Sequence, residues 1–113
     1  MKLFTFHLGF GEIQLIANEF VKESNSPHIG ITVVRIHTVQ EEVEVRWKWV
    51  SRDNVQLGNG TIFFNYENDQ KIINLDLKNV SRHLSSKIEL VETSNEFQLG
   101  KNKVANISLV GKL

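Results

Sequence analysis

The stretch Glu42–Val50, which reads EVEVRWKWV, decides the fold class of this chain. Apolar and charged side chains alternate along it, with valines and then tryptophans at every second position and acids or bases between them. Successive side chains of a β-strand point to opposite faces of a sheet. The stretch therefore predicts a strand with one face on the core and the other in solvent.

Similar alternating runs recur along the whole chain, and polar clusters that favour turns separate them. The other predicted strands are Ile13–Val21, Ile29–His37, Thr61–Tyr66, Lys71–Leu77, Lys87–Glu92 and Lys103–Val110, with Leu3–Phe10 as an additional one. The predicted turns include Ser24-Asn25-Ser26-Pro27, Arg52-Asp53-Asn54, Gly58-Asn59-Gly60, Glu67-Asn68-Asp69 and Ser94-Asn95. No window carries the apolar stripe of an amphipathic helix. The pattern predicts an all-β domain of seven or eight strands, either a sandwich or a barrel.

The composition suits one soluble domain that spans residues 1–113, with 41% hydrophobic and 23% charged residues. Its 13 basic and 13 acidic side chains cancel, which removes the field that attracts phosphate backbones. No apolar stretch is long enough to span a bilayer, and His7 and Gly9 interrupt the apolar run near the start. We therefore expect no nucleic-acid partner, no membrane insertion by this domain and no signal peptide in the chain. The absence of cysteine excludes disulfides and thiolate ligands.

Seven short patterns follow one another in a fixed order along the chain. They are Phe20-Val21-x-Glu23, Ile31-x-Val33-x-Arg35, Val43-x-Val45-x-Trp47, Gly60-Thr61-Ile62-Phe63-Phe64, Lys71-Ile72-Ile73-x-Leu75-x-Leu77, Ile88-x-Leu90 and Leu99-Gly100. Their order resembles that of the Calx-beta domains over residues 13–110, a family found in sodium/calcium exchangers and in adhesion and matrix proteins. The resemblance implies an immunoglobulin-like sandwich of two antiparallel sheets.

Calx-beta domains that bind calcium use carboxylates from several loops at one end of the sandwich, and the resemblance places four such positions on this chain. Glu23 matches the first and Asp53 the second, but the third reads Lys78-Asn79 and the fourth, Val110–Leu113, holds no acid. Because Ca²⁺ takes about six to eight oxygen ligands and needs its charge compensated, two acids opposed by lysine do not suffice. We predict a calcium-independent module without a cofactor, in which Glu23 and Asp53 are only weak metal candidates.

Trp47 and Trp49 alternate with Arg46 and Lys48, an arrangement that also occurs on nucleic-acid and carbohydrate platforms. The indoles share their strand face with valines, whereas the cations share theirs with glutamates. We therefore predict that both rings lie in the core and that the charges form cross-strand pairs. Solvent exposure of both rings would instead indicate a carbohydrate-binding sandwich.

No constellation of catalytic residues emerges from the sequence. The histidines, which are His7, His28, His37 and His83, lie in separate segments without the spacing of a metal site. No nucleophile motif is present, and no glycine-containing turn leads into a helix that could hold a phosphate. We predict that the chain is not an enzyme.

Three asparagines match the N-x-Ser/Thr pattern for glycosylation, and they are Asn59, Asn79 and Asn106. The first two fall in predicted turns and the third on the polar face of a predicted strand. Glycans at these positions are expected if the chain is part of a secreted eukaryotic protein.

Taken together, these patterns favour a non-catalytic extracellular module of an adhesion, matrix or receptor protein. Such a module provides spacing and binds protein partners or neighbouring repeats. Two other classes stay open: a carbohydrate-binding sandwich, and a small phage or viral structural protein that assembles symmetrically. The apolar run Leu3–Phe10 is also suited to pair, as an edge strand, with another chain or a neighbouring repeat.

Overall fold

The computed structural model describes residues 11–36, 41–78, 80, 83–94 and 97–111. All regular secondary structure within these ranges is β-strand, as the alternation predicted. The strands are β1 (Gly11–Leu15), β2 (Glu19–Glu23), β3 (His28–Ile36), β4 (Val43–Ser51), β5 (Gln56–Phe64), β6 (Gln70–Asp76), β7 (Ser85–Thr93), β8 (Phe97–Leu99) and β9 (Val104–Val110). The predicted strand Leu3–Phe10 lies outside the described residues.

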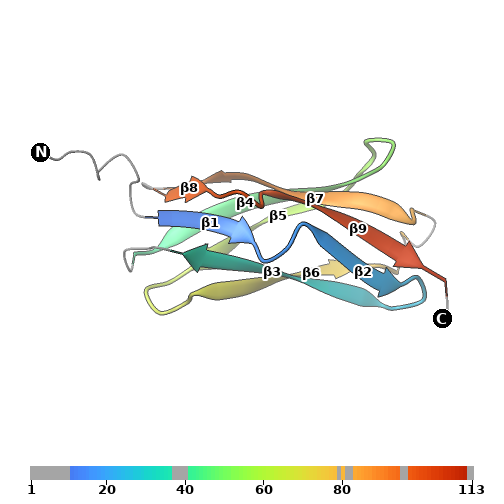
Figure 1. The fold of residues 1–113 in the computed structure, drawn as a ribbon, viewed down its shortest axis with the longest axis horizontal. Coiled ribbons are helices and arrows are strands. Elements are labelled where there is room, and N and C mark those ends of the chain that lie inside the picture. Colours follow the sequence, from blue (N-terminus) through green and yellow to red (C-terminus); the bar gives the residue numbers. More distant parts are fainter. Residues whose placement is uncertain (1–10, 37–40, 79, 81–82, 95–96, 112–113) are drawn as a thin grey trace, which may run out of the picture.

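The strands form two sheets that pack face to face (Figure 1). One sheet has the order β6-β3-β1-β8, and the other has the order β2-β9-β7-β4-β5. Most neighbours are antiparallel, but β1 and β8 are parallel, and so are β2 and β9. The prediction of an antiparallel sandwich of the immunoglobulin type is confirmed.

The prediction of one strand over Ile13–Val21 is wrong, because the chain leaves the first sheet after β1 and joins the second as β2. The last strands divide in the same way, with β8 in the first sheet and β9 in the second. The backbone NH of Leu15 bonds to the carbonyl of Asn102, and the NH of Asn106 bonds to that of Asn18, so the two crossings run side by side. The inward positions change phase at the first crossing, since Phe20 packs against the core while Val21, in phase with the buried Ile13 and Leu15, is exposed.

The core lies between the sheets and consists of inward side chains from eight strands and from Leu77, which follows β6. Its buried members are Ile13, Leu15, Ile29, Ile31, Val33, Val43, Val45, Trp49, Phe64, Ile73, Leu75, Leu77, Ile88, Leu90, Phe97, Ala105, Ile107 and Leu109. Removing this apolar area from water is the main force that holds the two sheets together. The alternation along β4 therefore has the physical basis that the sequence predicted.

The prediction of a turn at Gly58-Asn59-Gly60 is wrong, since the three residues lie inside β5. Gly60 is paired across the sheet with Trp47, and Gly58 with Trp49. A Cβ atom on Gly60 would come within 2.9 Å of the Trp47 ring, and one on Gly58 within 3.3 Å of the Trp49 ring. The glycines are therefore present to leave room for the indoles, and not to turn the chain.

Arg35 closes one end of the sandwich and is buried, with a relative exposure of 4%. Its guanidinium donates to the backbone carbonyls of Glu41 at 2.5 Å, of Asn65 at 2.9 Å and of Asn68. These carbonyls belong to the segment before β4 and to the turn between β5 and β6. One buried side chain therefore ties together two connections that are far apart in the sequence.

Candidate functional site

The residues that the sequence proposed as calcium ligands lie at the end of the sandwich where β2 and β9 finish (Figure 1). We call this end the C-terminal rim; it consists of residues 23–27, 51–55, 76–78, 83–86 and 110–111. The register aligns its parts, because Glu23 pairs with Val110, and Ser51 pairs with Ser86. The structure therefore brings Glu23, Asp53 and Lys78 to the same end of the molecule.

The structure does not bring Glu23 and Asp53 together. Glu23 lines a hollow with Val21, Ser26 and Val110, whereas Asp53 lines a different one with His83. Glu23 ends β2 and Asp53 lies in the turn that follows β4, and β9 and β7 separate these two strands. Three strand spacings amount to about 14 Å, and Ca²⁺–oxygen distances are about 2.3–2.6 Å. One ion therefore cannot bind both carboxylates in this arrangement.

A third acid of the rim, Asp76, was missed by the sequence reasoning. Its Oδ1 accepts a hydrogen bond of 2.8 Å from the backbone NH of Lys78, so the carboxylate stabilises the turn that follows β6. Both side chains are exposed. The pattern Asp-x-Lys could have indicated this turn, since aspartate commonly accepts from the backbone two residues further on.

Within the described residues, no group of three or more histidine, aspartate or glutamate side chains lies close enough together to hold a metal ion. Basic side chains also belong to the rim, namely Arg52 beside Asp53 and Lys78 after Asp76. Of the four histidines, His28 is exposed at the start of β3, and His83 is half-buried in the rim. His7 and His37 lie outside the described residues.

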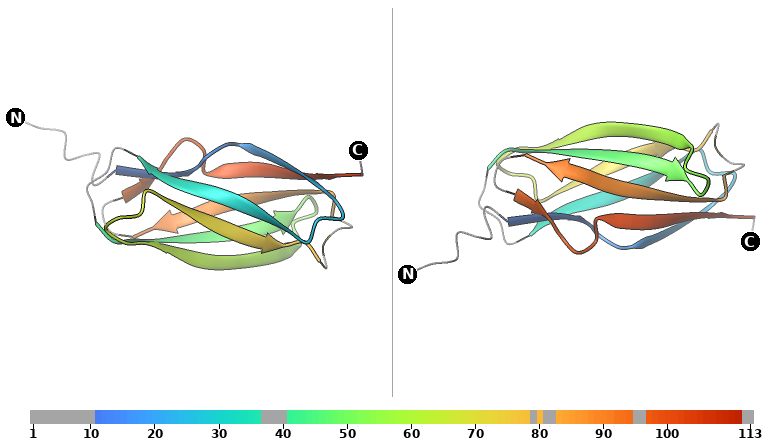
Figure 2. Two further views of the ribbon diagram at one scale, coloured as in Figure 1. Left: turned by 90° about the horizontal axis from the view of Figure 1, so that it is seen from below. Right: turned by 90° about the horizontal axis from the view of Figure 1, so that it is seen from above.

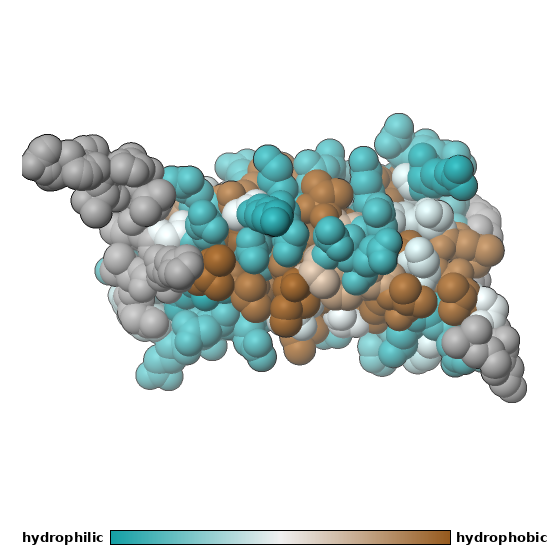
Figure 3. Space-filling model, in the orientation of Figure 1, coloured by the Kyte–Doolittle hydropathy of each residue, from teal (hydrophilic) through white to brown (hydrophobic). Residues whose placement is uncertain are grey.

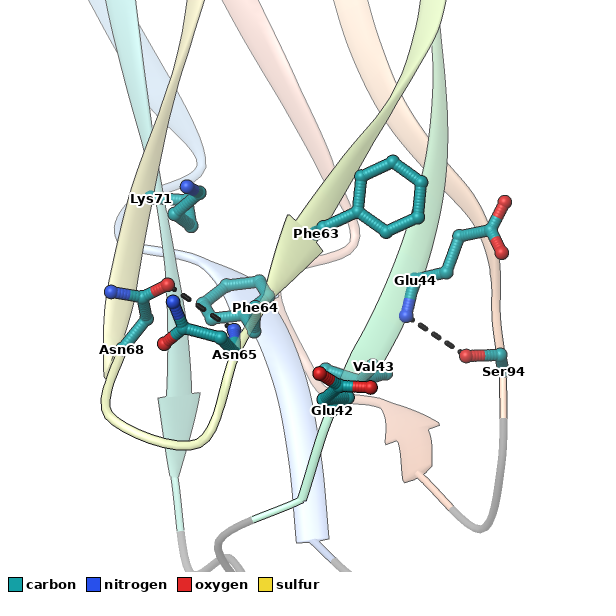
Figure 4. A pocket seen from close by; sticks show the side chains of 9 residues that line it. All are labelled: Glu42, Val43, Glu44, Phe63, Phe64, Asn65, Asn68, Lys71 and Ser94. Carbon is teal, nitrogen blue, oxygen red and sulfur yellow. Dashed lines mark hydrogen bonds between the residues drawn. The ribbon is translucent and has the colours of Figure 1, made fainter.

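At the opposite end, a hollow of about 420 Å³ opens beside the end of β5 (Figure 4). Phe63 borders it and is 61% exposed, and Glu44 and Lys71 lie on its two sides. Its other polar groups serve the local structure: Ser94 Oγ accepts from the NH of Glu44 at 2.8 Å, and Asn68 Oδ1 accepts from the NH of Asn65 at 3.2 Å. The hollow therefore offers one exposed aromatic ring but few polar groups that are free to bind a ligand.

The two tryptophans do not form a surface platform. Trp49 is 3% exposed, and its Nε1 donates to Ser86 Oγ at 2.9 Å. Trp47 is half-buried and packs against the core. The expected cross-strand charge pairs are also present, since Arg46 bonds to Glu92 at 2.6 Å and Lys48 lies 3.7 Å from Glu89. β4 therefore lacks the pair of solvent-exposed indole rings that would indicate carbohydrate binding.

The glycosylation candidates lie in different surroundings. Asn59 is exposed in the middle of β5, not in a turn, and Asn106 is exposed on β9, where it pairs with Lys87. Asn79 lies outside the described residues. Glycosylation at these sites stays a prediction.

A band of apolar surface runs lengthwise along the face on which β1 and β2 lie (Figure 3). The exposed apolar side chains of this part of the chain include Ile16 and Val21, at 54% and 63%. Contiguous apolar patches on a soluble protein commonly mark contacts with other molecules.

Comparisons with known proteins identify the fold. The apo form of the Calx CBD1 domain superimposes with a TM-score of 0.77 at 13% identity, covering 92% of this chain and 99% of that one. The Calx CBD2 domain gives 0.75 at 12% identity, covering 89% and 88%. The calcium binding domain CBD12 of CALX1.1 gives 0.75 at 13% identity, and this chain covers 45% of its length. No sequence profile of a known family matches the chain. No curated protein sequence matches it significantly either.

The chain thus has the Calx-beta fold, as the order of its strand patterns predicted. Among the residues that the structure describes, no helix is long and apolar enough to cross a membrane.

Proposed function

We propose that this chain is a non-catalytic spacer and protein-binding module of an extracellular adhesion, matrix or receptor assembly, and that it works without calcium. One observation carries the spacer role: β1 begins at one end of the long axis and β9 finishes at the other (Figure 1). Domains joined in series through such termini extend end to end. The module then adds its full length to the assembly.

The composition of the C-terminal rim supports independence from calcium. The Calx CBD12 structure is described as a calcium binding domain, but the acids of this rim come from separated strands. Asp76 is already bonded to the turn after β6, and Lys78 and Arg52 add positive charge. A divalent cation finds neither enough oxygen ligands nor compensation of its charge there.

Thermal unfolding with and without millimolar Ca²⁺ tests this part of the proposal. A ligand that binds only the native state raises the midpoint of unfolding. We expect the same midpoint in both conditions, for the parent chain and for the matched Glu23→Gln/Asp53→Asn variant. A calcium-dependent rise that the parent shows and the variant lacks would place a functional ion at the rim and overturn the proposal.

The spacer role is tested with a chain of two copies joined in tandem. Small-angle X-ray scattering should give a maximum dimension close to twice that of one copy. A tandem chain that is as compact as two domains packed side by side would refute a spacer function, whatever the result with calcium.

A further inference from the structure

Among the described residues, the two sheets have four edge strands, and only one of these lacks protection against pairing with another chain. β2 is short and carries two glutamates and a lysine, β8 has three residues, and β6 contains Lys71 and Asp76. β5 is nine residues long, QLGNGTIFF, without a charge or a proline. Long, uncharged edge strands are open to strand addition, and proteins usually block them with charges or prolines. β5 is therefore the accessible edge of this fold.

The side chains beside this edge are incompletely covered. Figure 2 shows β5 as the outermost strand of its sheet, and among the described residues it pairs with β4 alone. Leu57, Ile62 and Trp47 pack against the core but are only half-buried. An added strand with an apolar face would complete their burial.

Outside the described residues, the sequence of this chain contains a segment with the pattern expected of such a strand. Residues 3–10 read LFTFHLGF, in which phenylalanine and leucine occupy every second position, and no aspartate, glutamate, lysine or arginine is present. In extended form these eight residues reach about 27 Å, close to the roughly 30 Å of β5. The segment therefore matches the free edge in length, in lack of charge and in having one apolar face.

We propose that residues 3–10 of a second copy of this chain add as a strand to the free edge of β5. The donor must come from another copy because the segment leads directly into β1. β1 lies in the other sheet and is flanked by β3 and β8, on the far side of the fold from β5. The inference does not depend on the proposed function.

Cysteine cross-linking tests the contact directly, because the chain has no cysteine of its own. Thr5 alternates with the apolar donor residues, and Asn59, Thr61 and Phe63 are exposed on β5. A full-length Thr5→Cys chain is mixed under oxidising conditions with a chain carrying Asn59→Cys, Thr61→Cys or Phe63→Cys. Opposed residues of paired strands have Cβ atoms about 5 Å apart, so one of the three mixtures should form the mixed disulfide rapidly. Asn74→Cys, exposed on the edge strand β6, is the matched control and should not form it.

Each other outcome overturns the proposal. Faster cross-linking to Asn74→Cys would place the segment on β6. Dominant disulfides between two Thr61→Cys chains would indicate pairing of β5 with β5. A disulfide within a single Thr5→Cys/Thr61→Cys chain would show that the segment pairs with its own copy. A chain that sediments as a monomer over its whole range of solubility would show that no second copy binds.

Sedimentation equilibrium of two full-length variants provides a second test. Phe6→Lys places a charge on the apolar face of the donor, and Thr5→Lys places the same charge on the opposite face. The first should weaken dimerisation by about tenfold or more, and the second by much less. Equal effects would refute the assignment of faces. Both variants should retain the unfolding midpoint of the isolated domain, since neither changes a core residue described in the structure.

Discussion

The guanidinium carbon of Arg35 lies 5.4 Å from the centre of the Phe64 ring. The centre of the Phe97 ring lies 5.9 Å from the same guanidinium carbon. None of the contacts described for this buried cation is with a carboxylate; three backbone carbonyls and two aromatic faces surround it. Carbonyl dipoles and aromatic quadrupoles both present negative charge to a cation, so they can replace an acid as its partner.

Arg35→Lys should destabilise the fold although it keeps the charge. An ammonium has its three donors on one atom, whereas the planar guanidinium reaches Glu41 with Nη1 and both Asn65 and Asn68 with Nη2, so a lysine cannot bond all three carbonyls. We expect a loss of about 2–4 kcal/mol in the free energy of unfolding, measured with urea. A loss below about 1 kcal/mol would show that Arg35 does not hold this end of the sandwich.

Gly60→Ala should destabilise the protein more than Gly58→Ala. The new methyl group would lie 2.9 Å from the Trp47 ring in the first case and 3.3 Å from the Trp49 ring in the second. Overpacking of this kind costs about 1–3 kcal/mol. Denaturant unfolding of both variants measures the difference, and Trp47→Leu combined with Gly60→Ala should recover part of the loss. Purely additive effects of these two substitutions would contradict a direct contact between residues 47 and 60.

Trp49→Phe and Ser86→Ala should each cost about 1–3 kcal/mol, because each breaks the buried bond between Nε1 and Oγ and leaves one polar group without this partner. The double variant leaves neither group unpaired. Its loss should therefore be smaller than the sum of the two single losses, as determined by a double-mutant cycle of unfolding free energies. A coupling energy of zero between the two substitutions would rule out an energetic role for the bond.

Glu92→Gln should change the free energy of unfolding by less than about 0.5 kcal/mol, although the ion pair with Arg46 is short at 2.6 Å. The two side chains are 56% and 60% exposed, so water and salt screen their attraction. Unfolding at low and at high ionic strength checks both the size of the effect and its cause. A loss comparable to that of Arg35→Lys would show that the outer face of β4 contributes more to stability than its exposure suggests.

Much of the fold could be predicted from sequence because the relevant signal is local. Alternation along residues 43–49 requires one apolar and one polar face, and in a sequence without amphipathic-helix patterns the apolar face must be covered by a second sheet. The order of such runs was sufficient to predict the Calx-beta fold. Glu23 and Asp53 do lie at one end of the molecule, as the resemblance implied.

Only the tertiary structure decided the features that depend on pairing between distant segments. It divided the run Ile13–Val21 between two sheets, placed Gly58 and Gly60 opposite tryptophans, and surrounded Arg35 with carbonyls from two loops. It also placed Glu23 at the end of β2 and Asp53 after β4, with two strands between them. The physical reason is that periodicity specifies which face of a strand is apolar, whereas hydrogen-bond register and the close packing of rings on backbone specify which strand lies beside it.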